Sequence, residues 1–146
     1  RIGDGDQVWE HLNGLIKDFA TVSLLDLHPP RIFQIDGNFG AVAAVLESLA
    51  QFWHGRLHLL RALPPKWKTG RLEGLCVPGG HKISFSWHDG QVEHIEGTIG
   101  YSGELLIAGL GEYGGELVIR GEPGDSFQRL FGHDHEQNNG KTTAGR

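Results

Sequence analysis

One short run of the sequence combines residue types that could carry out acid–base chemistry. Asp36-Gly37-Asn38 places a carboxylate and a carboxamide on either side of a glycine, directly before an apolar, helix-forming segment. The start of a helix presents unpaired amide hydrogens and a positive dipole end, which favour a carboxylate. Gly37 and Gly40 let the backbone turn sharply and leave space for a ligand. An ionised carboxylate on such a loop suits a general base.

The same residues have a simpler interpretation, in which Asp36 or Asn38 only caps the helix. Asp and Asn are among the preferred residues at the N-cap position. On spacing alone, we therefore rank capping ahead of catalysis.

His28 is a second candidate, because two prolines follow it and hold its backbone direction. Its imidazole could bind a substrate hydroxyl or orient a carboxylate. Together with Asp26 and Asp36 it provides metal-ligand residue types, but the spacing matches no metal-binding motif. We expect neither a metal nor another cofactor.

Helical patterns surround these candidates. Residues 6–20 repeat apolar side chains at helical spacing, which predicts an amphipathic helix with Asp4 or Asp6 as its N-cap. The run from Ala41 to Phe52 is apolar on nearly every side, which is typical of a helix buried on most of its faces. We expect Trp53-His54-Gly55 to end it.

The period changes after Gly55, and the rest of the chain predicts strands. Ile83, Phe85 and Trp87 alternate with polar residues, as in a half-buried strand. The dipeptide Asp89-Gly90 predicts a hairpin turn into a partner strand. Further short strands are expected at 57–60, 72–77, 92–99, 105–108 and 116–120.

Composition excludes several classes of function. The formal net charge of -5 leaves no basic stripe for a nucleic acid, so we expect no nucleic-acid partner. No apolar run is long enough for a membrane-spanning helix, and we expect no membrane partner. The single Cys76 excludes an internal disulfide. Because the chain lacks both an initiator Met and a signal peptide, we expect residue 1 to lie inside a longer protein.

Several motifs in one order resemble glycoside hydrolase family 95, whose members include α-L-fucosidases. The first is His28-Pro-Pro followed by Phe33-Gln-Ile-Asp36-Gly-Asn38-Phe-Gly40. In many members Phe-Gln follows His-Pro-Pro directly, whereas Arg31-Ile32 separates the two motifs in this chain. The downstream motifs are Leu57-His-Leu-Leu60, Ala62-Leu-Pro64, Trp67, Gly70, Gly74-Leu75, Gly79-Gly80 and the run from Ile83 to Gly90.

This resemblance implies an α+β chain, with the last helices of an (α/α)6 barrel followed by a C-terminal antiparallel β domain. We expect residues 1–55 to form the end of the catalytic helical domain and residues 56–120 to form the β domain. Residues 121–146 are expected to be a disordered tail, because few of them are apolar.

The resemblance also implies a function, namely that of an inverting glycosidase that removes terminal α-L-fucose from oligosaccharides or glycans. Asp36 falls at the family's base-side aspartate, and His28 and Asn38 are expected to bind the substrate. The general-acid glutamate would belong to the remainder of the barrel, so we expect this chain to be inactive in isolation. A secreted or periplasmic location is suggested. The alternative is a non-catalytic β module that binds carbohydrate or packs against a barrel.

Overall fold

The computed structural model describes residues 3–110 and 115–132. The chain divides into two compact units, and each has its own architecture. The first comprises Arg1–Gln51 with Leu60–Lys66, and the second comprises Phe52–Leu59 with Trp67–Arg146.

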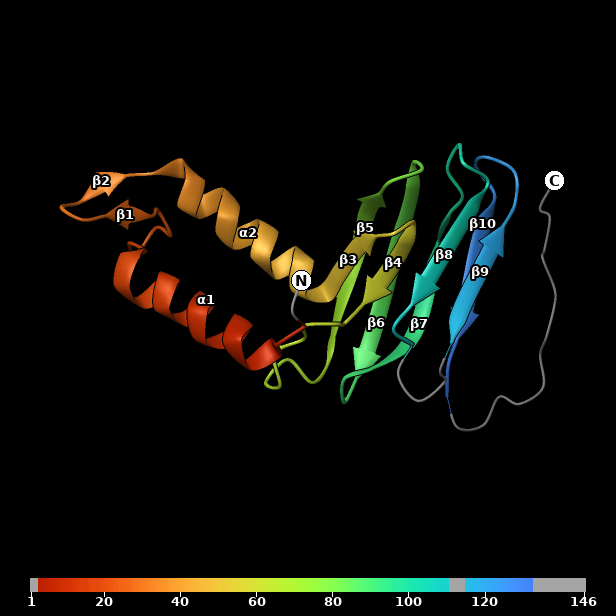
Figure 1. Cartoon of the computed structure of the whole chain (residues 1–146), viewed down its shortest axis with the longest axis horizontal. Helices are drawn as coiled ribbons and strands as arrows, with labels where there is room; N and C mark the ends of the chain where they lie inside the picture. The colour runs from red at the N-terminus through yellow and green to blue at the C-terminus, as the bar shows by residue number, and fades with distance from the viewer. Residues whose placement is uncertain (1–2, 111–114, 133–146) are drawn as a thin grey trace. The chain divides into compact units, whose positions relative to one another are not determined.

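The first unit contains two helices joined by a small hairpin (Figure 1). Its elements in chain order are α1 (Gly5–Phe19), β1 (Leu27–His28), β2 (Ile32–Phe33) and α2 (Ile35–Leu49). Helix α1 confirms the predicted amphipathic helix. Asp4 is its N-cap, since its Oδ1 accepts a hydrogen bond from the Gln7 amide at 3.0 Å.

Helix α2 differs from the sequence prediction at both ends. It begins at Ile35 rather than Ala41, so Asp36 lies inside the first turn and not before the helix. It ends at Leu49, because Ala50–Trp53 leaves the helix to become strand β3. His54 and Gly55, with φ of 49° and 73°, form the turn that follows. The expectation that Trp53-His54-Gly55 ends the helix was therefore wrong.

The second unit is a sandwich of two four-stranded sheets (Figure 1). One sheet has the order β10-β7-β6-β5, from Ser126–Leu130, Gln91–Thr98, His81–His88 and Gly70–Val77. The other has the order β3-β4-β8-β9, from Ala50–Trp53, Arg56–Leu59, Glu104–Ala108 and Glu116–Arg120.

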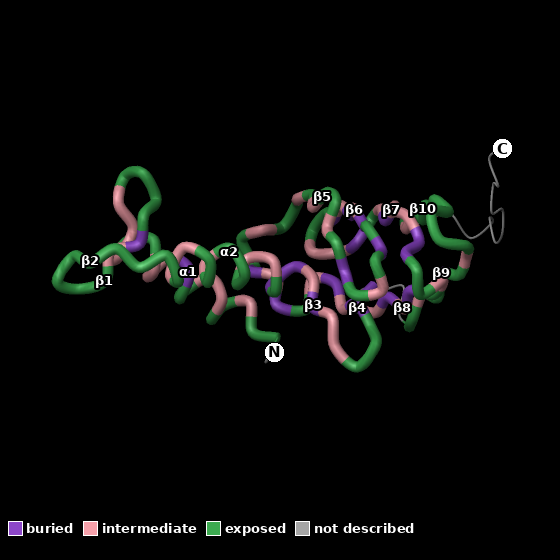
Figure 2. Tube along the Cα trace, turned by 90° about the horizontal axis from the view of Figure 1, so that it is seen from above, coloured by how far each residue is buried: buried purple, intermediate pink, exposed green. Residues whose placement is uncertain are grey.

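The core of the second unit lies between these sheets, where Figure 2 shows the buried residues of both. Along β6 the side chains of His81, Ile83, Phe85 and Trp87 are buried and alternate with more accessible ones. This confirms the predicted half-buried strand. The facing core residues of the other sheet include Leu57, Leu59, Leu105, Ile107 and Ile119.

Two further expectations need correction. Strand β4 pairs with β8 in parallel, with Leu57 opposite Ile107, so the β domain is not wholly antiparallel. Strand β10 lies inside the range 121–146 that was expected to be disordered, because it pairs with β7 along its whole length. Residues 133–146 of that predicted tail lie outside the described residues. Two α-helices are present in the described ranges, so the barrel itself stays a prediction.

Candidate active site

Asn38 ties the loop before α2 to the first turns of that helix. Its side-chain Oδ1 accepts a hydrogen bond from the backbone amide of Asp26 at 2.9 Å. Its Nδ2 donates to the carbonyl oxygen of Leu24 at 2.5 Å. One carboxamide therefore satisfies a donor and an acceptor of a segment that lies far upstream in the sequence.

Asp26 and Gly37 approach each other closely at the same point. Asp26 is 8% exposed, and its carbonyl oxygen accepts the Gln34 amide hydrogen at 3.2 Å. A Cβ atom built on Gly37 would lie 2.2 Å from the Asp26 carboxylate oxygen Oδ2. Only glycine fits at position 37 without displacing that carboxylate. No local pattern in the sequence indicates this contact, because it joins residues on two different elements.

His28 lies on the hairpin formed by β1 and β2. The strands pair with His28 opposite Ile32, and the Arg31 amide donates to the His28 carbonyl at 2.7 Å. Arg31-Ile32, the residues that depart from the family pattern, thus form part of the turn and the second strand. The exposed imidazole stacks on Phe19, with ring centroids 6.2 Å apart. When Nδ1 donates to the Pro29 carbonyl at 3.1 Å, the neutral ring presents Nε2 as an acceptor.

Asp36 is exposed in the first turn of α2. The N-cap residue is Gln34, and no side chain makes a capping hydrogen bond there. The interpretation in which Asp36 or Asn38 caps this helix is therefore wrong. Asp36 projects from a helix whose start is held to the loop by Asn38, and its carboxylate is exposed to solvent.

Glu47 is the other acidic residue of α2, but its place on the helix excludes it as a partner acid for Asp36. Eleven residues along an α-helix correspond to a rise of about 16 Å. The two carboxyl groups of an inverting glycosidase are about 6.5–9.5 Å apart. No group of three or more His, Cys, Asp or Glu side chains in the described ranges could hold a metal ion.

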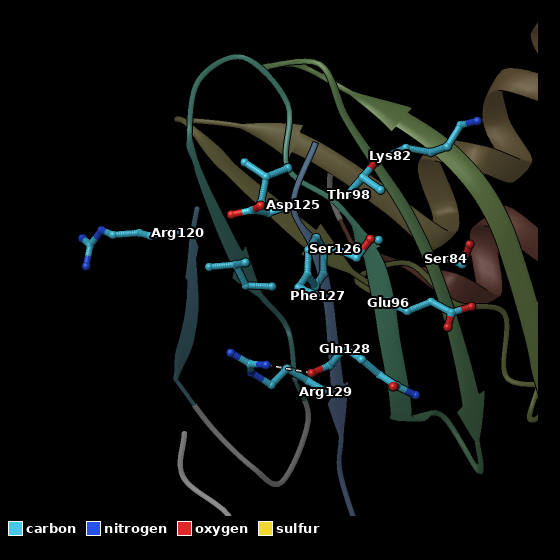
Figure 3. Close-up of a pocket in the computed structure, with 13 residues that line it drawn as sticks. Lys82, Ser84, Glu96, Thr98, Arg120, Asp125, Ser126, Phe127, Gln128 and Arg129 are labelled. Carbon is cyan, nitrogen blue, oxygen red and sulfur yellow. Dashed lines mark hydrogen bonds between the residues drawn. The ribbon is translucent and has the colours of Figure 1, made fainter. Parts of the chain in front are cut away.

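The β domain carries a groove of its own, with a volume of about 620 Å³ (Figure 3). The strand register aligns polar side chains in two rows across β6, β7 and β10: Lys82, Thr98, Ser126 and Ser84, Glu96, Gln128. Arg120 points away from the other labelled side chains and pairs with Glu104, with Nε and Oε2 2.5 Å apart. The groove is thus lined by hydroxyl, amide and carboxylate groups, of which the Gln128 amide contacts His94 and the Glu96 carboxylate pairs with Arg71.

His81 and Ser102 form a hydrogen-bonded pair that is structural rather than catalytic. The Gly100 amide donates to His81 Nδ1 at 3.0 Å, so the ring proton is on Nε2 and points to Ser102 Oγ at 2.7 Å. The hydroxyl in turn donates to the Glu104 carbonyl at 3.1 Å. Burial lowers the pKa of His81, and the contact with Glu104 opposes this only in part. An imidazole that already donates to the hydroxyl cannot remove its proton.

No helix in the described part of the chain is both long and apolar enough to cross a membrane.

The sequence matches two family models. Residues 1–49 match the glycosyl hydrolase family 95 catalytic domain, and residues 51–111 match the glycoside hydrolase family 95 C-terminal domain. The two models meet where α2 gives way to β3. The candidate residues Asp36, His28 and Asn38 all fall inside the match to the catalytic domain. Their roles stay predictions, as does the domain boundary at residues 55 and 56.

Named relatives agree with these models. The chain is 45% identical over 71 residues to "Alpha-L-fucosidase 2" of Arabidopsis thaliana, which covers 48% of this chain and 8% of that protein. It is 34% identical over 101 residues to "Probable alpha-fucosidase A" of Aspergillus niger, covering 60% of this chain and 12% of the relative. The chain thus spans only 8% to 12% of the length of these relatives. Residues 1–49 and 51–111 each match a domain of one family, and the chain therefore belongs to glycoside hydrolase family 95.

Proposed function

We propose that this chain supplies the base-side carboxylate, Asp36, of an inverting glycoside hydrolase that removes terminal α-L-fucose from oligosaccharides or glycans. The observation that carries the proposal is the position of Asp36. It is exposed in the first turn of α2, within the residues that match the family's catalytic domain.

The reaction that follows is a single displacement at the anomeric carbon. Asp36 takes a proton from a water molecule, and the water oxygen forms a bond to the anomeric carbon on the face opposite the leaving group. The bond to the leaving oxygen breaks, and a carboxylic acid protonates that oxygen. In this proposal the acid comes from the remainder of the catalytic barrel, which is the partner of this chain. His28 accepts a hydrogen bond from a sugar hydroxyl through Nε2.

The chain alone should therefore hydrolyse an aryl α-L-fucoside no faster than buffer. General acid catalysis contributes roughly 100- to 10,000-fold, and the acid is absent from the isolated chain in this proposal. Measurable turnover by the 146-residue chain that disappears with Asp36→Asn would contradict this part of the proposal.

In the enzyme assembled with the rest of its catalytic domain, Asp36→Asn should lower kcat by at least about 100-fold, because the variant cannot accept the proton from water. Azide should restore turnover as a nucleophile that needs no base, and the product should be the inverted fucosyl azide. Asp18→Asn, in α1, is the matched control and should keep full activity. Retention of kcat by Asp36→Asn would exclude Asp36 as the base.

The groove on the β domain supports a second candidate, a carbohydrate-binding module. Rows of hydroxyl, amide and carboxylate groups on neighbouring strands suit the hydroxyl groups of a sugar. Titration of the chain with fucosylated oligosaccharides should then give saturable binding that Gln128→Ala weakens and Lys68→Ala, outside the groove, does not. Absence of binding would exclude the carbohydrate-binding role and favour a domain that only packs against the catalytic barrel.

A further inference from the structure

We propose that Asn38 is a positioning residue, which acts through the backbone of residues 24–26. This inference rests on the proposed function of Asp36 and gives Asn38 a different role from the substrate contact expected from the sequence. Its basis is that Oδ1 and Nδ2 of Asn38 each form a hydrogen bond to the protein backbone.

The two hydrogen bonds fix the orientation of the carboxamide. Nδ2 donates to the Leu24 carbonyl and Oδ1 accepts from the Asp26 amide. Each end of the carboxamide keeps one further hydrogen-bonding position, the second N–H of Nδ2 and the second lone pair of Oδ1. Loss of the carboxamide would leave the Asp26 amide, in a partly buried position, without this acceptor, which is unfavourable.

Local hydrogen bonds also hold this segment: the Leu24 amide donates to the Thr21 carbonyl at 2.9 Å, and the Leu25 amide donates to the Thr21 hydroxyl at 3.0 Å. Leu24 adopts a left-handed backbone conformation with φ of 61°, which is unfavourable for a residue with a branched side chain. The Leu24 and Leu25 side chains are exposed, so little apolar burial holds this part of the loop. The Asn38 side chain adds a link between this locally hydrogen-bonded segment and the first turns of α2.

That segment leads directly into the hairpin that carries His28, while Asn38 itself lies two residues after Asp36 on α2. The loop and α2 also meet at a second contact, where the side chain of the buried Asp26 lies against Gly37. Asn38 thus links the backbone near Asp36, the proposed base, to the backbone that leads to His28, the residue proposed to bind the sugar. Its loss would misplace the two groups relative to each other without removing either.

The direct test is amide hydrogen exchange in the 146-residue chain, which does not depend on catalysis. Asn38→Ala should speed exchange of the Asp26 amide by about tenfold, the loss expected for one hydrogen bond. Asn13→Ala is the matched control, because it removes an Asn hydrogen bond to the Trp9 carbonyl inside α1. Unchanged protection of Asp26 in Asn38→Ala would overturn the proposal, whatever the role of Asp36.

The kinetic test uses the enzyme assembled with the rest of its catalytic domain. Asn38→Asp keeps the acceptor for the Asp26 amide but places a carboxylate oxygen against the Leu24 carbonyl, so it removes one of the two bonds where Asn38→Ala removes both. A positioning role predicts a fall in kcat with KM within about twofold, because ground-state binding is not lost. A rise in KM with unchanged kcat would assign Asn38 to the sugar and overturn the proposal. Full activity of Asp36→Asn would instead reject Asp36 as the base. The hydrogen-exchange result for the Asp26 amide would not be affected by that outcome.

Discussion

Gly37, in the first turn of α2, has no room for a larger side chain. The atoms that a Cβ would meet there belong to the Asp26 side chain, at 2.2 to 2.9 Å. That group is buried, and its backbone is hydrogen-bonded to Asn38 and Gln34. The carboxyl group therefore has little room to move away.

We expect Gly37→Ala to destabilise the first unit by about 1–3 kcal/mol, as overpacking does in a well-packed site. Gly40→Ala on the same helix is the control, because nothing lies within 4 Å of its Cβ position. The control should be neutral or gain up to about 1 kcal/mol of helix stability. Denaturant unfolding followed by far-UV circular dichroism measures both, and equal stability of the two variants would contradict the close contact.

His81 links the stability of the β domain to pH. It is 1% exposed, its neutral ring accepts the Gly100 amide hydrogen, and burial holds its pKa below the ordinary value of 6.5. The unfolded chain then binds more protons than the folded chain below that value. The stabilisation is fully present above pH 6.5 and is lost as the pH falls from there through the lowered pKa.

The expected result is a fall in the free energy of unfolding between about pH 7 and about pH 5 that is smaller in His81→Gln. His88→Gln, which changes an exposed imidazole on the same strand, is the control and should retain the full fall. An identical pH dependence in His81→Gln and in the unaltered chain would show that His81 does not titrate as expected.

At the scale of elements, the hairpin of β6 and β7 shows how local chemistry sets a register. Asp89 and Gly90 have φ of 47° and 76°, the left-handed values that the predicted turn requires. The Gly90 amide also donates to the Lys68 carbonyl at 3.0 Å. The turn thereby holds both the hairpin and the segment that leads into β5.

Gly90→Ala should cost about 1–2 kcal/mol, because a Cβ disfavours the left-handed conformation. Gly132→Ala is a suitable control, since that glycine has open space around it and no left-handed φ. Thermal unfolding of the β domain, followed through its buried Trp87, should show a lower Tm only for Gly90→Ala. Equal Tm values would mean that the turn tolerates a side chain.

At the scale of the whole molecule, α2 presents an apolar face that nothing in the described residues of its own unit covers. Ile35, Phe39 and Val42 lie on one side of the helix and are 48%, 65% and 61% exposed. The sequence predicted burial on most faces, whereas Ser48 and Leu49 are the buried residues of this helix. Covering this face is what further barrel helices would do.

We expect the chain to bind an apolar fluorescent dye through this face, as large exposed apolar patches do. The double variant Phe39→Glu with Val42→Glu should lose most of the dye fluorescence. Tyr101→Ser, which removes an exposed aromatic ring from the β domain, should keep it. Dye fluorescence that is unchanged in the double variant would place the apolar surface elsewhere.

The sequence by itself determined the elements whose signals are local. The apolar period of α1 with its Asp4 cap, the alternation along β6 and the Asp89-Gly90 turn all depend on neighbouring residues. The motif around Asp36 also indicated the family, because its residue types and order are specific.

The tertiary structure alone decided the features that depend on distant partners. β1 and β2 have two residues each, and β10 is an edge strand, so none of them carries a periodic signal. The parallel pairing of β4 with β8 depends on a crossover. Asn38 reads as a helix cap in the sequence, yet its carboxamide binds the backbone of residues 24 and 26. Side-chain periodicity reports which face of an element is apolar, but a hydrogen bond between distant segments forms only once the fold brings them together.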